Sequence, residues 1–176
     1  MITKKVEKAV NDQIKKEEYS SRLYLAMASW CQKNGYPGAA AFLYKHSEEE
    51  RLHQLKFVHY VNDRQGYAVL QEIEQPPFKF DNLLKMFQEI IKHEQFITAS
   101  INELYHVAVT EKDYTTANFL QWFITEQLEE ENLFNGILDQ MALAGTDKSG
   151  LFHIDKELGA KAAAPAGGGA AATPAT

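Results

Sequence analysis

The spacing of the proline residues limits the possible folds of this chain more than any other feature. The prolines stand at positions 37, 76, 77, 165 and 174. Proline interrupts a helix because it lacks the backbone donor and clashes with the preceding turn. The long intervals between the prolines carry apolar residues three and four positions apart, which is the period of an amphipathic helix. The sequence therefore predicts an all-α fold built from a few long helices.

The connections between these helices predict how they are arranged. The turns 34–38 and 111–115 are short, so each joins two antiparallel helices. Residues 67–80 lack a helical period, and when extended they reach roughly 46 Å, about the length of a 30-residue helix. This segment can therefore cross a whole four-helix bundle and make the second and third helices parallel. The predicted helices are 3–33, 39–65, 82–110 after an N-cap at Asp81, 115–144 before a C-cap at Gly145, and a short 151–159.

The composition favours one globular domain that handles cations. The 176 residues carry a formal net charge of -6, and nucleic-acid binding usually needs a basic face, so we expect no nucleic-acid partner. The single cysteine, Cys31, fits a reducing compartment. Without a secretory signal or a membrane-crossing run, we expect a cytoplasmic protein that does not contact a membrane. Residues 1–160 form the expected domain, and the Ala-, Gly-, Pro- and Thr-rich residues 161–176 are predicted to be a disordered tail.

A carboxylate interrupts the apolar face of every predicted long helix near its middle. These residues are Glu17, Glu50, Glu94 and Glu130. An isolated buried carboxylate is costly and normally protonates, and four converging carboxylates would also repel one another. No lysine or arginine stands at the same level and on the same face, whereas two divalent cations would balance the charge. His53 faces the same way as Glu50, and oxygen ligands with one imidazole suit Fe, Mn or Zn.

Three ring side chains near these acids have separate interpretations. Tyr24 is in phase with the first carboxylate, and we expect it to donate a hydrogen bond to a metal ligand, with electron donation to oxygen as the alternative. His46 is interpreted as a packed residue or a hydrogen-bond partner of a ligand. His93 points about 100° away from Glu94 and is predicted to lie on the surface. The other predicted inner-face residues are Leu83, Phe87, Ile90, Ile91, Ile97, Ile101 and Tyr105 on the third helix, and Leu120, Phe123, Ile124, Phe134, Leu138 and Met141 on the fourth.

Five segments of the sequence together carry a specific resemblance to one family. They are EEYSSRLYLAMASWC (17–31), GAAAFLYKHSEEERLH (38–53), KHEQFIT (92–98), NFLQWFITEQLEEENLF (118–134) and GLFHIDKEL (150–158). With these segments the chain resembles the haem-free bacterial ferritins over about residues 1–159. The resemblance implies the ferritin-like four-helix bundle, with its one long crossover and its short fifth C-terminal helix.

The resemblance also implies a ferroxidase centre with two irons inside each subunit. One iron would be held by Glu17, Glu50 and His53. The second would be held by Glu50, Glu94 and Glu130, so that Glu50 bridges the two irons. In this reading the crowded acids serve a chemical purpose, because the cations between them remove their repulsion.

Further residues match the family's pattern beside these two positions. Gln127 matches a residue that hydrogen-bonds within the centre or coordinates weakly. A third, more exposed iron site would use Glu49, Glu126 and Glu129, with Glu130 as a candidate shared ligand. The resemblance therefore implies two adjacent acidic sites.

The family implies iron storage in a hollow shell of twenty-four identical subunits, whose fifth helices line the four-fold axes. Fe²⁺ would be oxidised by O₂ or H₂O₂ and stored as a ferric mineral. Bacterioferritins instead carry two Glu-x-x-His motifs and bind haem through a methionine inside one of them. Here Arg51 and Leu52 occupy the motif on the second helix, and Gln127-x-x-Glu130 replaces the other motif. We therefore expect no haem, and a second iron that is held loosely.

Three alternatives remain open from the residues alone. A di-iron oxygenase or peroxidase of the same fold would keep both metals, and it would want a second histidine ligand on the fourth helix. A DNA-protecting mini-ferritin would lack the fifth helix and would place its sites between subunits. A helical scaffold without catalysis would carry its acids only for their charge.

Overall fold

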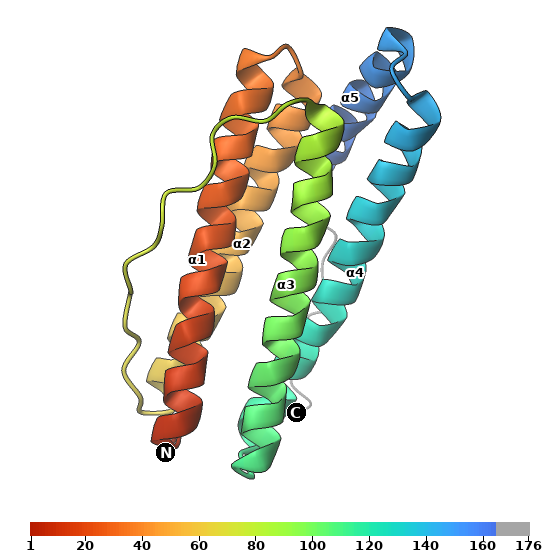
Figure 1. Cartoon of the computed structure of the whole chain (residues 1–176). Helices are drawn as coiled ribbons and strands as arrows, with labels where there is room; N and C mark the ends of the chain where they lie inside the picture. Colours follow the sequence, from red (N-terminus) through yellow and green to blue (C-terminus); the bar gives the residue numbers. More distant parts are fainter. Residues whose placement is uncertain (165–176) are drawn as a thin grey trace.

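The computed structural model describes residues 1–164, and over that range the chain forms five helices and no strand. Figure 1 shows α1 and α2 as one antiparallel hairpin and α3 and α4 as another, with α5 packed beside the upper part of α2. The predicted all-α bundle with a long crossover and a fifth helix is confirmed. The helices are α1 (Lys4–Lys33), α2 (Pro37–Asp63), α3 (Leu83–Thr110), α4 (Tyr114–Ala144) and α5 (Lys148–Ala163).

The helix starts lie within three residues of the predicted ones, and two of the differences have a clear physical cause. Helix α2 begins at Pro37 rather than at residue 39, because proline suits the first helical position, where its missing donor costs nothing. Helix α3 is capped by Asn82 rather than Asp81, since the Asn82 side chain accepts a hydrogen bond from the Lys85 amide. The predicted C-cap of α4 is confirmed at Gly145, which has a positive φ of 58°.

Helix α5 is longer than the predicted 151–159. Its first turn starts at Lys148 because the Asp147 side chain accepts a hydrogen bond from the Gly150 amide. At its other end the helix continues to Ala163, past the predicted start of the low-complexity tail. The prediction for the rest of that tail, residues 165–176, falls outside the described residues. Across residues 1–164, every helix is too short or too polar to cross a bilayer.

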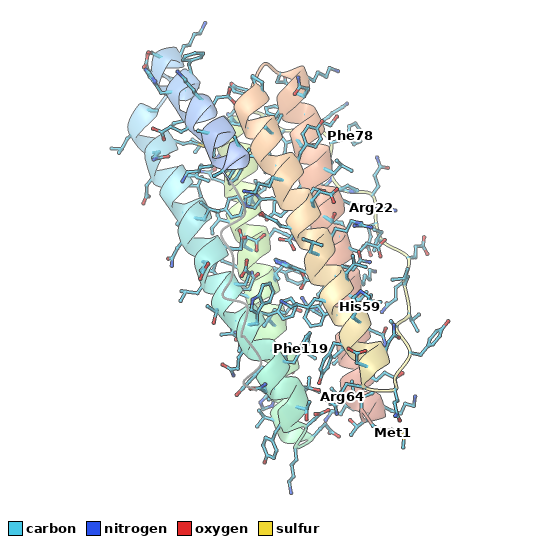
Figure 2. All side chains as sticks on the ribbon, turned by 180° about the vertical axis from the view of Figure 1, so that it is seen from behind. Met1, Arg22, His59, Arg64, Phe78 and Phe119 are labelled. Atoms are coloured by element: carbon cyan, nitrogen blue, oxygen red, sulfur yellow. The ribbon has the colours of Figure 1, made fainter. Side chains whose placement is uncertain are left out.

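The crossover is fastened along α1 by two buried side chains. The Asn11 amide group donates to the Tyr67 carbonyl at 3.0 Å, and its oxygen accepts from the Val69 amide at 2.6 Å. Glu7 accepts from the Tyr67 amide at 2.9 Å. Arg64 at the start of the crossover lies at the same end of the bundle as Met1, and Phe78 lies toward the other end (Figure 2). These contacts let α2 and α3 run parallel.

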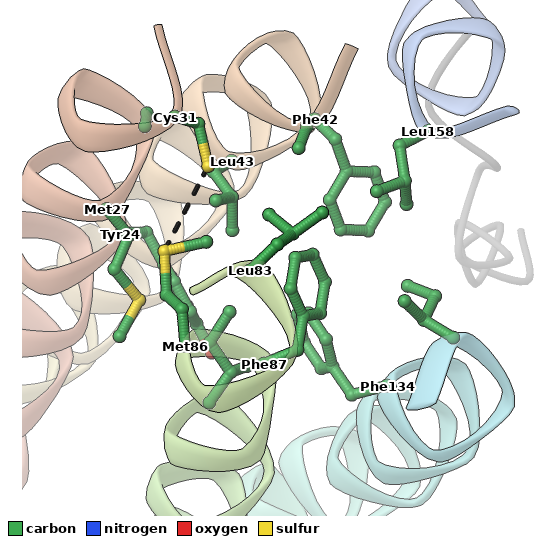
Figure 3. Packing of buried hydrophobic residues seen from close by; sticks show 14 of the residues in the cluster. Tyr24, Met27, Cys31, Phe42, Leu43, Leu83, Met86, Phe87, Phe134 and Leu158 are labelled. Carbon is green, nitrogen blue, oxygen red and sulfur yellow. Dashed lines mark hydrogen bonds between the residues drawn. The ribbon is translucent and has the colours of Figure 1, made fainter. Parts of the chain in front are cut away.

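Two apolar clusters fill the bundle, one on each side of a polar middle layer. The cluster near α5 includes Phe42, Phe87 and Phe134, which approach one another from three helices (Figure 3). In the same cluster the Cys31 sulfur lies 4.0 Å from the Met86 sulfur, so Cys31 is a packed core residue. The second cluster, around Phe57, fills the opposite half of the bundle.

The predicted inner faces of α3 and α4 are correct except at three positions. Tyr105, Leu138 and Ile124 are only half-buried, and Leu104 and Ile137 are buried instead. On α4 the buried positions step by four, three and four from Glu130 to Met141, which includes residue 137 and passes over 138. The sequence could not separate these neighbours because both are apolar and both fit a three-or-four spacing.

Helix α5 completes the start of α2, which has no cap of its own. The buried Asp155 carboxylate accepts hydrogen bonds from the amides of Gly38 at 3.2 Å and Ala39 at 2.8 Å. The approach is so close that a Cβ on Gly38 would stand 1.8 Å from the Asp155 carbonyl oxygen. A negative side chain at a helix N-terminus satisfies free donors and the helix dipole. The glycine therefore permits the contact between α2 and α5.

We predict that Gly38→Ala destabilises the protein by roughly 1–3 kcal/mol, the usual range for overpacking, because the added methyl group collides with backbone atoms of α5. Gly136→Ala is the matched control, since a Cβ there meets nothing within 4 Å. That control should be neutral or stabilising by up to about 1 kcal/mol. Thermal unfolding measures both variants, and equal melting temperatures would contradict the prediction.

Candidate metal centre

Four carboxylates lie in the polar layer between the two apolar clusters, one from each long helix. Their positions follow from the chain: on α3, for example, Glu94 stands between Ile91 of one cluster and Ile97 of the other. All four side chains belong to residues that are at most 8% exposed. The helical period that buries the apolar residues therefore also buries these acids. They are Glu17, Glu50, Glu94 and Glu130.

Glu17, Glu50 and His53 form one compact group. One ligand atom from each of the three lies within 4.8 Å of the other two, and the Nδ1 atom of His53 is 3.3 Å from an oxygen of Glu50. The His53 ring packs edge-on against Trp122, with ring centroids 5.3 Å apart. Two carboxylates and an imidazole at this separation suit a first-row divalent ion.

Glu94 is held by donors from two other helices. The Tyr24 hydroxyl donates to one carboxylate oxygen, and the Gln127 amide group donates to the other at 3.0 Å. Gln127 also reaches the Glu94 carbonyl and the Thr98 hydroxyl, each at 3.3 Å. Burial and the nearby carboxylates raise the pKa of Tyr24 well above its usual value, so the phenol stays neutral and donates. The expected hydrogen bond from Tyr24 is therefore present.

Glu130 differs from the other three, because one of its oxygens is fully buried and also has no hydrogen-bond partner among the described residues. The Nε2 atom of His46 lies 3.7 Å from this oxygen. The other nitrogen of His46 lies 3.0 Å from the Phe42 carbonyl, and that oxygen can only accept, so this nitrogen is the donor. Burial lowers the pKa of His46 to about 4, so the ring is neutral. The Nε2 atom of His46 then carries a free lone pair. A cation between this nitrogen and the Glu130 oxygen would satisfy both of them.

The electrostatics of the layer favour cations. Burial raises the pKa of Glu17 to about 8 and that of Glu130 to about 9, and neighbouring carboxylates add to both shifts. Burial raises the pKa of Glu50 well above its ordinary value and also raises that of Glu94, although the donors of Tyr24 and Gln127 oppose the latter shift. The four carboxylates therefore take up protons unless another positive charge replaces them.

The three acids predicted for a third site lie beside this centre. Together with Glu130 and His46, they line an open pocket of about 410 Å³ between α2, α4 and the end of α5. Burial raises the pKa of two of them, Glu49 and Glu126. The third, Glu129, is exposed. The pocket, which Lys45 and Lys161 also line, therefore leads from the buried layer to solvent past these carboxylates.

One sequence interpretation was wrong, and one contributing residue was missed. His93 is half-buried rather than on the surface, because it fills the space between α1 and α3, and its Nε2 atom lies 2.7 Å from the Ser20 hydroxyl. Gln13 was not predicted, yet its amide group donates to Glu17 at 2.7 Å and it is only 1% exposed. Its position one turn before Glu17 is the signal that could have indicated it.

Comparisons with known proteins agree with this geometry. The family model "Ferritin: Ferritin-like domain" matches residues 7–144. A "Bacterial non-heme ferritin" of Campylobacter jejuni is 47% identical over 158 residues, which cover 90% of this chain and 95% of that protein. A protein of the same name from Escherichia coli O157:H7 is 44% identical, covering 90% and 96%.

Solved structures give the same result. An open-pore ferritin from the archaeon Archaeoglobus fulgidus superimposes with a TM-score of 0.89 at 39% identity, covering 90% of this chain and 98% of that one. The predicted resemblance is thus confirmed over most of the chain by sequence and by structure. This chain belongs to the ferritin family, among relatives of the haem-free bacterial type.

Proposed function

We propose that this protein oxidises Fe²⁺ at the mid-bundle carboxylates and stores the iron as a ferric mineral inside a shell of twenty-four like chains. The observation that carries the proposal is the unpaired, buried oxygen of Glu130 in a layer of four acids. A hydrogen-bonded network would have given that oxygen a donor. A cation between the carboxylates supplies the positively charged partner that the described residues do not give this oxygen. Membership of the ferritin family supports iron as that cation.

The residues divide into two iron positions. Glu17, Glu50 and His53 hold one Fe²⁺, and Glu50, Glu94 and Glu130 hold the other, with Glu50 shared. The close grouping of the first three supports the first position. Gln127 and Tyr24 act through hydrogen bonds, because both donors already point at Glu94. Such partners orient a ligand and tune the metal it binds.

The reaction balances with iron and the oxidant as substrates. Two Fe²⁺ ions lose one electron each, and O₂ takes up two electrons and two protons to leave as H₂O₂. Where H₂O₂ is the oxidant, it takes up the same electrons and protons and leaves as water. Carboxylate oxygens are hard ligands that favour Fe³⁺ over Fe²⁺, so binding here helps to drive the oxidation. Release of Fe³⁺ then needs a second set of hard ligands nearby.

The acidic pocket beside the centre supplies such ligands. Glu49, Glu126 and Glu129 line it with Glu130, so Glu130 can face both the centre and the pocket. We propose that these acids form a third iron site on the route from the centre to the mineral. We propose a route without haem, since the Glu50–His53 motif contains Arg51 and Leu52 and no methionine.

We predict that Glu94→Ala slows iron oxidation by at least ~10-fold, since it removes a proposed ligand of the second iron and loss of only a ligand's hydrogen-bond partner already costs about 10–100-fold. The measurement adds Fe²⁺ anaerobically to metal-free protein, admits air and follows Fe³⁺ by absorbance. Glu48→Ala, which removes an exposed glutamate of α2, should leave the rate unchanged. An unaltered rate in Glu94→Ala would refute catalysis at this site, as would a wild-type rate equal to that in buffer.

We predict that the metal-free protein loses stability as the pH rises from 6 to 9. The folded-state pKa values of Glu17 and Glu130, about 8 and 9, lie above the ordinary value of 4.5. At pH values between the ordinary and the raised pKa, the folded state therefore binds more protons than the unfolded state. The free energy of unfolding consequently falls as the pH rises through this range. Saturating Co²⁺ should reduce the slope, because the ion replaces the protons. Melting temperatures across this pH range, with and without Co²⁺, provide the measurement.

Glu130→Gln serves as the control for this pH dependence, since it keeps the shape of the side chain and removes one titrating group. The melting temperature of this metal-free variant should vary less with pH than that of the wild type. A wild-type melting temperature that stays constant or rises toward pH 9 would show that the four acids are not buried together in solution.

We predict that the purified protein elutes as a large shell and not as a monomer of 19.9 kDa or a dimer. Storage requires an enclosed volume, which one or two chains cannot provide. Light scattering coupled to size-exclusion chromatography measures the mass. A stable monomer or dimer that retains two irons would instead favour an oxygenase or peroxidase.

A further inference from the structure

A chain of hydrogen bonds connects Glu17 to a lysine at the edge of the bundle. The Lys16 ammonium donates to the Ser100 hydroxyl, which donates to the Gln13 amide oxygen at 2.5 Å. The Gln13 amide nitrogen then donates to a Glu17 oxygen at 2.7 Å. This series of hydrogen bonds passes from α1 to α3 and back to α1, and 87 residues separate Gln13 from Ser100 in the sequence. Lys16, Ser100 and Gln13 are not themselves among the proposed iron ligands.

The direction of this chain is fixed by its outer end. An ammonium group can only donate, so the Ser100 oxygen must accept from Lys16 and use its one proton toward Gln13. The Gln13 amide must therefore turn its oxygen to Ser100 and its NH₂ group to Glu17. Without Lys16 and Ser100 the amide could rotate and place its oxygen against the carboxylate, where the two would repel each other.

Burial makes this arrangement rigid at its inner end. Gln13 is 1% exposed and Ser100 is 9% exposed, so water has little access to replace either partner. Lys16 is only partly buried, and burial lowers its pKa. It borders an open pocket of about 450 Å³ between α1, α3 and the crossover, which also contains His93 and Phe96. An amide does not pass protons readily, so the chain holds a carboxylate in place and does not conduct protons.

Each of the two proposed iron positions contains one carboxylate that is oriented by donors, and the second position also contains Glu130. Glu17 and Glu94 are both oriented by donors, whereas an oxygen of Glu130 has none. We propose that Gln13, held by Ser100 and Lys16, is a positioning residue that fixes Glu17 for the Glu17–Glu50–His53 metal position. This inference rests on the proposed function, because it assigns a role toward a metal that the same residues are proposed to hold.

The test isolates one metal position at a time and uses Co²⁺ as the probe, since Co²⁺ binds without being oxidised. In a Glu130→Ala background only the Glu17–Glu50–His53 position keeps all its ligands. There we expect Ser100→Ala to weaken Co²⁺ binding about 10-fold, the lower end of the effect of losing a ligand's hydrogen-bond partner. Ser100→Thr, which retains the hydroxyl, should restore the affinity to within about twofold. Competition with a coloured chelator measures each dissociation constant.

Two controls separate positioning from general loosening of the bundle. In a Glu17→Ala background, Ser100→Ala should leave the remaining Co²⁺ affinity unchanged, because Gln13 then has no carboxylate to orient. Together with the single variants, this measurement completes a double-mutant cycle. Ser21→Ala removes another hydroxyl between two helices, one that donates to the Ser47 carbonyl at 2.7 Å and touches neither Gln13 nor Ser100. This variant should have no effect in either background.

The outcomes distinguish this inference from the proposed function. Unchanged Co²⁺ affinity in Ser100→Ala with the Glu130→Ala background would overturn the positioning role and leave the metal centre intact. An equal loss in both backgrounds would overturn it as well, since it would show general loosening. A wild-type protein that binds no Co²⁺ would overturn both the proposed centre and this inference.

Discussion

The rest of the structure depends on the cost of burying four carboxylates in one layer. Ionised acids at this depth lose their hydration and repel one another. The two apolar clusters above and below the layer supply the hydrophobic stabilisation, but they cannot compensate four unpaired charges. In the metal-free protein protons compensate the charge below the raised pKa values of these acids, and in the proposed function divalent ions replace those protons. In the proposed function the same energetic conflict that would destabilise the fold supplies the affinity for iron.

The layer is asymmetric in a way that fits a passage for iron. Glu17 and Glu94 are oriented by donors from Gln13, Tyr24 and Gln127, so these carboxylates are rigid. Glu130 has an unpaired oxygen and borders the acidic pocket. In the proposed function, the second iron therefore has one firmly held ligand, Glu94, and one ligand without donors, Glu130, which favours binding of Fe²⁺ followed by departure of Fe³⁺. Two equally rigid halves would suit a metal that stays in place.

Periodicity was enough to predict the bundle and the inward direction of the four acids, because burial of a helix follows from local spacing. It could not choose between neighbours such as Ile137 and Leu138, since rotation of a helix by a fraction of a turn is set by packing. Local sequence patterns also could not predict which side chains on different helices contact each other. Examples are Asp155 capping α2 and Ser100 fixing Gln13, each made by residues far apart in the sequence.

The most direct measurement is anomalous diffraction at the iron edge from crystals soaked anaerobically in Fe²⁺. The account predicts two iron peaks in the middle layer, one bounded by Glu17, Glu50 and His53 and the other by Glu50, Glu94 and Glu130. A layer without iron, in which the four carboxylates share protons or have turned into solvent, would contradict it.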